Sequence, residues 1–273
     1  DYDLVILSGD NDGEKPYLEK LLPKNTNFQF NQKPEDKLEF IKNLQKNGKK
    51  VMVVVELQAR FDEENNIYWA DKLQEEGARV IYGVPGLKVH SKLFIITARE
   101  NGKEIYYSHI GTGNFNEKSS RIYTDFSILT SNKDIAVDLN KIFDFYDNNY
   151  KIPSFKKLLV APFFMRKNFI ELINNEIQFA KKKKTASITL KMNSLVDKEM
   201  INKLYEASQA GVKITLIIRG VCCLVTEMEG WSDNIKVFSI VDKYLEHARV
   251  FIFHNDGKEK IFISSGDWMT RNL

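Results

Sequence analysis

The sequence predicts an α/β protein of two tandem units related by internal duplication, each with a mixed, mostly parallel sheet flanked by helices. Three observations support this prediction. Amphipathic helical segments are repeatedly followed by a glycine and then by an apolar run. The apolar runs are continuous, which favours strands covered on both faces. A longer pattern of strand, hairpin and strand occurs twice in the same order, which indicates a duplication.

The helix–Gly–strand pattern occurs three times, in "KLEFIKNLQKNGKKVMVVVEL", "IYWADKLQEEGARVIYG" and "MINKLYEASQAGVKITLIIRG". In each stretch the apolar residues first follow a helical period and then form an uninterrupted run rich in β-branched residues. The pattern places the helix stops at Gly48, Gly77 and Gly211. The strands that follow are expected over 51–55, 80–82 and 214–218.

The stretch "KVHSKLFII" predicts a strand over 88–96 that points His90 and Lys92 to the same side. A single His-x-Lys pair is most simply explained as part of a solvated edge. The second half, however, contains "YLEHARVFIF", with His247 and Arg249 in the same relation. In each half a polar hairpin follows ("ARENGKE" and "HNDGKEK"), and then a strand that ends in small residues and an asparagine. The repetition favours a functional role for the two histidines.

Composition limits the class of protein. Hydrophobic residues make up 43% of the chain and charged residues 28%, which is typical of a folded globular protein. A net charge of +3 gives no reason to expect a nucleic-acid partner. No apolar run approaches the length of a membrane span. The two cysteines, Cys222 and Cys223, are neighbours and offer no disulfide framework, so we expect a cytoplasmic protein, with a peripheral position at the membrane left open.

The boundary between the halves is expected near "DNNYKIPSFKKL", where Pro153 and Ser154 interrupt a helix. The sequence therefore predicts a first domain over 1–153 and a second over 154–273. Residues 1–30 match no pattern and remain unplaced, and the second domain is expected to be truncated at its end.

Two such His-x-basic strands resemble the phospholipase D superfamily, and several long stretches resemble one family within this fold, the long-chain polyphosphate kinases. These stretches are "VVVELQARFDEENNIYWADKLQEEGARVIYG", "GLKVHSKLFII", "HIGTGNFNEKSSRIYTDFS", "LLVAPFFMRKNFIELI", "LKMNSLVDKEMINKLYEASQAGVKITLIIRGVCCL" and "SIVDKYLEHARVFIFHN". The resemblance is to the two carboxy-terminal, phospholipase D-like catalytic domains. It implies reversible transfer of the terminal phosphate of ATP to polyphosphate, with Mg²⁺ and a phosphohistidine intermediate, and a homo-oligomer in the full-length enzyme.

The resemblance also implies roles for individual residues. His90 would be the phosphorylated nucleophile and His247 its partner from the second half. His109 would be an accessory histidine, although a structural role is an equal alternative. Tyr123, Arg219, His247 and Lys92 would bind nucleotide or phosphate, and Arg60 would lie beside magnesium. A core aromatic and an ordinary edge lysine remain alternatives for Tyr123 and Lys92.

Independent support exists for the two arginines. Arg60 and Arg219 follow corresponding strands, at the carboxyl ends where α/β sheets bind ligands. A guanidinium group can bind phosphate with two parallel hydrogen bonds.

Three departures from the family keep other functions open. The family's amino-terminal domains and an upstream arginine have no match here, since the region "NFQFNQKPEDK" offers none, and the chain stops before the last elements of the second domain. An inactive polyanion-binding fragment is therefore one alternative, and activity of this stretch alone is left open. A phospholipase D-type phosphodiesterase is another, although position 97 is Thr97 where such enzymes carry an aspartate.

Overall fold

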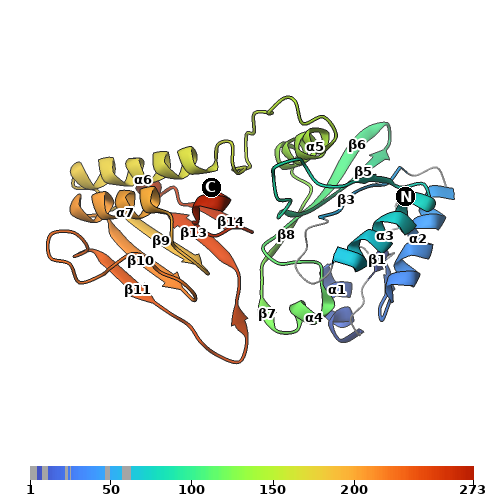
Figure 1. Ribbon diagram of the computed structural model, residues 1–273, viewed down its shortest axis with the longest axis horizontal. Coiled ribbons are helices and arrows are strands. Elements are labelled where there is room, and N and C mark those ends of the chain that lie inside the picture. Colours follow the sequence, from blue (N-terminus) through green and yellow to red (C-terminus); the bar gives the residue numbers. More distant parts are fainter. Residues whose placement is uncertain (1–4, 8–11, 22–23, 25, 47–49, 57–62) are drawn as a thin grey trace. The chain divides into compact units, whose positions relative to one another are not determined.

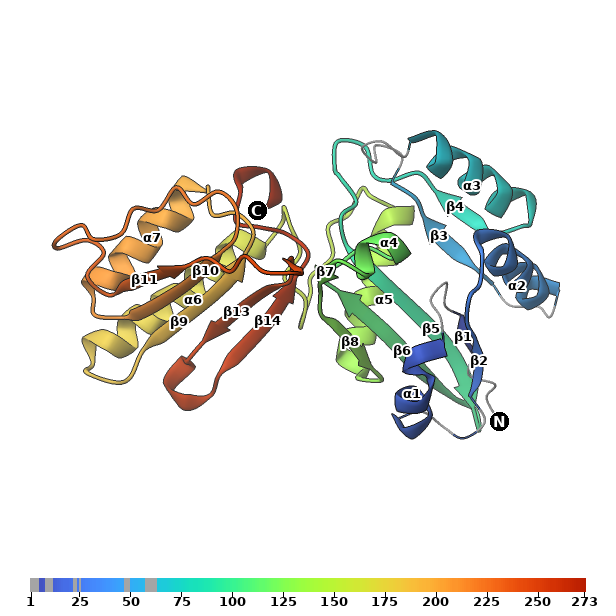
Figure 2. The same cartoon turned by 90° about the horizontal axis from the view of Figure 1, so that it is seen from below.

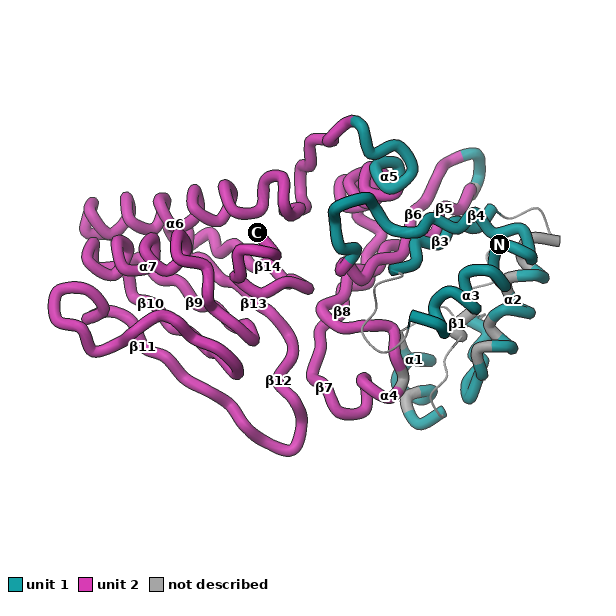
Figure 3. Tube along the Cα trace, in the orientation of Figure 1, with its two compact units in different colours: residues 1–89, 100–102, 144–150 teal, residues 90–99, 103–143, 151–273 magenta. Residues whose placement is uncertain are grey.

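The computed structural model describes residues 5–7, 12–21, 24, 26–46, 50–56 and 63–273 (Figure 1). The chain divides into two compact units (Figure 3). Unit 1 comprises residues 1–89, 100–102 and 144–150, and unit 2 comprises residues 90–99, 103–143 and 151–273. Every described candidate site residue belongs to unit 2.

Unit 1 consists of short strand pairs and helices. Its elements are β1 (Val5–Leu7), η1 (Asp12–Glu14), α1 (Lys15–Leu21), β2 (Asn27–Gln29), α2 (Pro34–Lys46), β3 (Met52–Val54), α3 (Glu63–Glu75) and β4 (Arg79–Ile81). The pairs β1–β2 and β3–β4 are parallel. Gly77 follows α3 with a φ of 86°, a left-handed conformation that glycine adopts without strain, so the predicted helix–Gly–strand unit is confirmed here. Gly48 lies outside the described residues.

The first part of unit 2 contains a three-stranded sheet in the order β5–β6–β8 (Figure 2). The elements of this part are β5 (Lys92–Glu100), β6 (Lys103–Gly111), α4 (Glu117–Ser120), β7 (Tyr123–Thr124), β8 (Ser127–Thr130) and α5 (Lys133–Asp147). The last residue of β5 and the last turn of α5 are counted with unit 1. The predicted hairpin between β5 and β6 is confirmed: Asn101 and Gly102 have φ values of 47° and 78°, as a two-residue Asn-Gly turn requires.

The strand predicted over 88–96 begins later than expected, at Lys92, so His90 precedes the strand. The physical reason is local. A turn at Pro85 and Gly86 closes with a hydrogen bond from Leu87 N to the Val84 carbonyl. The amide of Val89 then donates to a carboxylate oxygen of Glu56 at 2.8 Å. A side chain thus binds an amide that a continuous strand would have used in its ladder.

The second part of unit 2 is a five-stranded mixed sheet in the order β11–β10–β9–β13–β14. Its elements are α6 (Met165–Lys181), β9 (Ser187–Met192), α7 (Lys198–Gln209), β10 (Lys213–Ile218), β11 (Ile235–Phe238), β12 (Leu245–Glu246), β13 (Arg249–Phe253), η2 (Asn255–Gly257), β14 (Lys260–Ser264) and η3 (Thr270–Asn272). Strands β9, β10 and β11 are parallel, and β13 runs antiparallel to both of its neighbours, β9 and β14.

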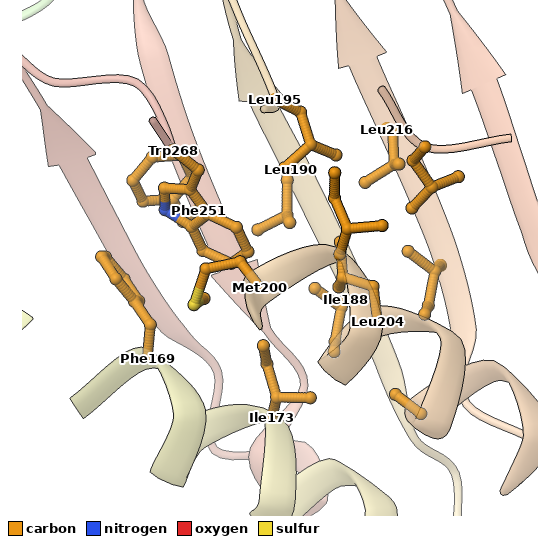
Figure 4. Packing of buried hydrophobic residues seen from close by; sticks show 14 of the residues in the cluster. Phe169, Ile173, Ile188, Leu190, Leu195, Met200, Leu204, Leu216, Phe251 and Trp268 are labelled. Atoms are coloured by element: carbon orange, nitrogen blue, oxygen red, sulfur yellow. The ribbon is translucent and has the colours of Figure 1, made fainter. Parts of the chain in front are cut away.

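Helices α6 and α7 lie on one face of this sheet and cover its core (Figures 1 and 4). Phe169 and Ile173 of α6 pack with buried residues of the strands, among them Leu190 and Phe251. Burial alternates along β9, β10 and β13 between fully and partly buried positions, so the face toward α6 and α7 is more completely covered than the other. The period of two is visible in the β9 sequence SITLKM, whereas the more continuous apolar runs of β10 and β13 hide it.

Among the described residues, two of the features that connect the parts of unit 2 are a buried carboxylate and a short strand pair. Asp138 of α5 is fully buried, and its carboxylate accepts hydrogen bonds from three successive backbone amides, those of Lys156, Lys157 and Leu158. Strand β7 pairs in parallel with β12, so the first half of the sequence is joined to the second by a two-residue ladder (Figure 3). This ladder positions the candidate site.

Candidate active site

The candidate site lies at the carboxyl edge of the parallel strands in unit 2. Asn193 follows β9 and Arg219 follows β10, so both stand where these strands end. Because β13 is antiparallel to β9, the residues that precede it, including His247, lie at the same edge. This is the edge at which open α/β sheets bind their ligands.

His247 is held by a carboxylate that comes from the first half of the chain. Its Nδ1 lies 2.8 Å from Oδ1 and 3.0 Å from Oδ2 of Asp125, and its ring packs against Tyr123 with 4.9 Å between centroids. A carboxylate only accepts hydrogen bonds, so Nδ1 carries the proton. Burial lowers the pKa of His247; the Asp125 hydrogen bond opposes this, and the charges of Arg249 and Arg219 lower it further. The imidazole is therefore neutral near neutral pH.

Glycine and threonine in "HIGTGN" make room for Asp125 and orient it. The Thr112 hydroxyl donates to Asp125 Oδ1 at 2.6 Å, and the amide of Phe126 donates to the same hydroxyl at 2.9 Å. A Cβ on Gly113 would stand 2.1 Å from Oδ2 of Asp125, so only glycine fits there. The motif thus acts on the carboxylate that orients His247.

Two arginines border His247, and both are fixed by polar partners. Arg249 is buried; its Nε lies 3.1 Å from Oδ1 of Asp267, and its Nη1 donates to the carbonyl and Nε2 of His247 at 2.8 and 3.1 Å. The Nε of Arg219 donates to Oδ1 of Asn193 at 3.0 Å and to the Glu246 carbonyl at 2.9 Å. Within the described part of the chain, the two terminal nitrogens of Arg219 have no hydrogen-bond partner, so its fork is open to an anion.

His109 occupies a different environment. It is 7% exposed, its ring stacks on Phe94 with centroids 4.9 Å apart, and its Nε2 lies 3.1 Å from the Ser127 hydroxyl. Burial lowers the pKa of His109, and its Nδ1 has no hydrogen-bond partner among the described residues. A Cβ on Gly111 would approach the His109 ring to 2.8 Å. These contacts favour the structural alternative for His109.

His90 and Lys92 form a second group. His90 is exposed and precedes β5, whereas Lys92 is buried and its ammonium donates to the His90 carbonyl. Arg249 makes the corresponding contact to the His247 carbonyl. The basic residue two positions after each histidine therefore anchors the backbone of that histidine in both halves.

Sequence reasoning found Tyr123, Arg219 and His247, which the structure brings together, but missed Asp125 and Asp267. Period-two spacing from Tyr123 in "RIYTDF" was the available signal for Asp125. Arg60 lies outside the described residues. In the described part of the chain, no three His, Cys, Asp or Glu side chains gather in a way that could hold a metal ion, and no helix is long and apolar enough to cross a membrane.

Comparisons with known proteins agree with this architecture. The family model "Polyphosphate kinase C-terminal domain 1" matches residues 32–152, and "Polyphosphate kinase C-terminal domain 2" matches residues 158–273. The two matches in tandem agree with the predicted duplication.

Two curated relatives are similar over 227 residues: the polyphosphate kinases of Escherichia coli K12, 52% identical, and Vibrio cholerae, 54% identical. In each case the alignment covers 83% of this chain and 33% or 32% of the relative, so the chain spans about a third of their length. A crystal structure of polyphosphate kinase from Porphyromonas gingivalis superposes with a TM-score of 0.77 at 43% identity, covering 87% of this chain and 39% of that one. The chain belongs to the polyphosphate kinase family and corresponds to its carboxy-terminal region.

Proposed function

We propose that this chain is the catalytic region of a polyphosphate kinase, which transfers the terminal phosphate of ATP reversibly to polyphosphate through a phosphohistidine at His90. The observation that carries the proposal is the cluster at the carboxyl edge, where His247, oriented by Asp125, stands beside the open fork of Arg219. A neutral imidazole beside guanidinium groups suits phosphoryl transfer, which needs positioning and positive charge around the phosphate oxygens.

The reaction has two steps. A ring nitrogen of neutral His90 attacks the γ-phosphorus of ATP; a P–N bond forms while the bond between the γ-phosphorus and the bridging oxygen breaks, and ADP leaves. A terminal phosphate oxygen of polyphosphate then attacks the same phosphorus, the P–N bond breaks, and the chain is one phosphate longer. When the P–N bond breaks, the attacking nitrogen of His90 regains its lone pair and the imidazole is neutral again, so the complete cycle restores His90 and the reverse route to ATP is open as well.

Residues of the His247 site would bind the phosphate oxygens and the nucleotide. The fork of Arg219 binds phosphate oxygens with two parallel hydrogen bonds, while Nε of the same residue fixes its position. His247 keeps its proton on Nδ1, so its Nε2 accepts the hydrogen bond of Arg249. The guanidinium groups of Arg249 and Arg219 supply the positive charge for the oxygen that leaves. Tyr123, packed on the His247 ring, offers a flat surface for the nucleotide base.

Mg²⁺, ATP, polyphosphate, a homo-oligomeric full-length enzyme and a cytoplasmic or membrane-peripheral location enter the proposal from the family. The described residues provide no cluster fit to hold Mg²⁺, so no step is assigned to it here. Arg60 and Lys92 keep their proposed places near magnesium and phosphate. The domain boundary after residue 153 remains a proposal, as does the role of residues 1–30.

The test is protein labelling. The chain is incubated with γ-³²P-ATP and Mg²⁺, and acid-labile, base-stable label on the protein is measured. We expect label on the wild type, none on folded His90→Ala, and retained label on the matched control His254→Ala, whose side chain caps η2. Persistent label on folded His90→Ala would contradict the assignment. Cleavage of labelled phospholipid or nucleic acid without ATP would favour the phosphodiesterase, and polyphosphate binding without label the inactive polyanion-binding protein.

A further inference from the structure

The ladder that joins the two halves of unit 2 is short. Strands β7 and β12 each contribute two residues, in the register Leu245 with Tyr123 and Glu246 with Thr124. Such a short parallel pair makes few backbone hydrogen bonds, so the backbone alone specifies its register weakly. The register nevertheless decides what meets His247, because Tyr123 and Asp125 both belong to this segment.

The two faces of the ladder carry different residues. Side chains alternate along a strand, and residues paired in register share a face. Tyr123 and Asp125 therefore lie on the face that meets His247, as their contacts with its ring confirm. Thr124 and Glu246 lie together on the opposite face, with the Thr124 hydroxyl 3.2 Å from Oε2 of Glu246.

Side chains on the opposite face of the ladder contact the five-stranded sheet. The Thr124 hydroxyl also lies 3.2 Å from the Leu245 carbonyl, across the ladder. The ammonium of Lys191, on β9, lies 3.0 Å from Oε2 of Glu246 and 3.0 Å from the Ala248 carbonyl. The side chains of Lys191 and Glu246 are only 17% and 24% exposed, so water weakens this ion pair less than it would at a fully exposed site.

These contacts belong to a row of hydrogen bonds along the backbone of residues 245–248. The four successive carbonyls of 245–248 each accept a hydrogen bond from a side chain: those of Thr124, Arg219, Arg249 and Lys191 in turn. The arginines stand next to the site itself, whereas Thr124 and Lys191 bind the first and last carbonyl of the row. The backbone that bears His247 is thus held at both ends by residues on the side of the ladder away from the reaction.

We propose that Thr124, Glu246 and Lys191 form a register key, a set of positioning residues that fixes β7 against β12 and so delivers Asp125 and Tyr123 to His247. A slip of one residue would turn Tyr123 and Asp125 to the other face and leave His247 without its carboxylate. The consequence for turnover rests on the function proposed above, whereas the consequence for His247 itself does not.

The test reads the His247 ring directly, by ¹⁵N NMR of the folded 273-residue chain labelled at its four histidines. The groups that face this ring are Asp125, Tyr123, Arg249 and Arg219. In the wild type we expect the Nδ1–H tautomer. Since the Asp125 hydrogen bond raises the pKa of His247, Thr124→Val and Lys191→Met should lower that pKa and populate the Nε2–H tautomer.

Three further variants separate positioning from general destabilisation. Thr124→Ser keeps the hydroxyl and should restore the wild-type tautomer. Glu246→Gln keeps an acceptor for Thr124 but loses the ion pair with Lys191. Its His247 spectrum should therefore lie between that of the wild type and that of Thr124→Val. Lys203→Met removes an ion pair with Glu206 within α7, away from the ladder, and should leave His247 unchanged.

Kinetics give a second measurement. Loss of the partner that orients a metal-bound histidine costs about 10- to 100-fold. By analogy with such histidines, we expect kcat to fall by about that factor in Thr124→Val and Lys191→Met, with a smaller change in KM. Unchanged tautomer and pKa of His247 in folded Lys191→Met and Thr124→Val would overturn the proposal. If the spectra change as expected while the wild type forms no phosphohistidine, the register key stands and the proposed function fails.

Discussion

A methyl group on Gly113 should dislodge the carboxylate that orients His247. The added Cβ would lie 2.1 Å from Oδ2 and 2.3 Å from Cγ of Asp125, far inside ordinary contact distance. The carboxylate would have to move by more than an ångström. Its bonds to Thr112 and His247, now 2.6 and 2.8 Å long, cannot both survive that displacement.

The magnitude follows from these contacts. Overpacking typically costs about 1–3 kcal/mol, and losing a hydrogen bond to a charged group costs about 1.5–3 kcal/mol. Because Asp125 is partly exposed and can regain water, we expect Gly113→Ala to lower the free energy of unfolding by about 2–4 kcal/mol. Backbone strain does not contribute, since Gly113 does not have a positive φ.

Denaturant unfolding of a double-mutant cycle measures this effect. Asp125→Gly removes all three atoms that the new Cβ would meet, so Gly113→Ala should cost much less in that background. Gly266→Ala is the matched control, because its Cβ would have no neighbour nearer than 3.7 Å, and it should be nearly neutral. An equal cost of Gly113→Ala in both backgrounds would refute the reasoning, since the clash would then involve some other group.

Two further predictions concern charged and titrating groups. Arg219→Lys keeps the charge but loses the planar fork and the Nε that binds Asn193. Turnover per folded molecule should fall on the order of a hundredfold with little change in melting temperature. Near-normal turnover would mean that Arg219 does not touch the reacting phosphate. His109 is kept neutral by burial, so its contribution to stability is complete above its unfolded pKa of about 6.5 and is lost as pH falls toward the lowered pKa of the folded state. Denaturation midpoints of wild type and His109→Phe at pH 7.5 and pH 5 should show the larger acid loss in the wild type; equal losses would contradict a buried, neutral His109.

Local structure could be predicted from sequence because its causes are local. The helix α3, its stop at Gly77 and the strand β4 depend on periodicity and on one left-handed glycine. The hairpin at Asn101 and Gly102 depends on two residues that accept positive φ. The start of β5 escaped prediction because Glu56, more than thirty residues away, binds the amide of Val89.

Some residues of the candidate site could likewise be found from the sequence, whereas others could not. Repetition within the sequence singled out His90 and His247 as candidates, and the position of Arg219 after an apolar strand made it a candidate ligand-binding residue. Both signals, a duplication and a strand end, can be read from the sequence alone. Asp125 is 122 positions from His247, and only the β7–β12 ladder brings the two within hydrogen-bond distance. A carboxylate acts over a few ångströms, so its role is decided by which strand ends share an edge of the sheet, and that arrangement exists only once the chain has folded.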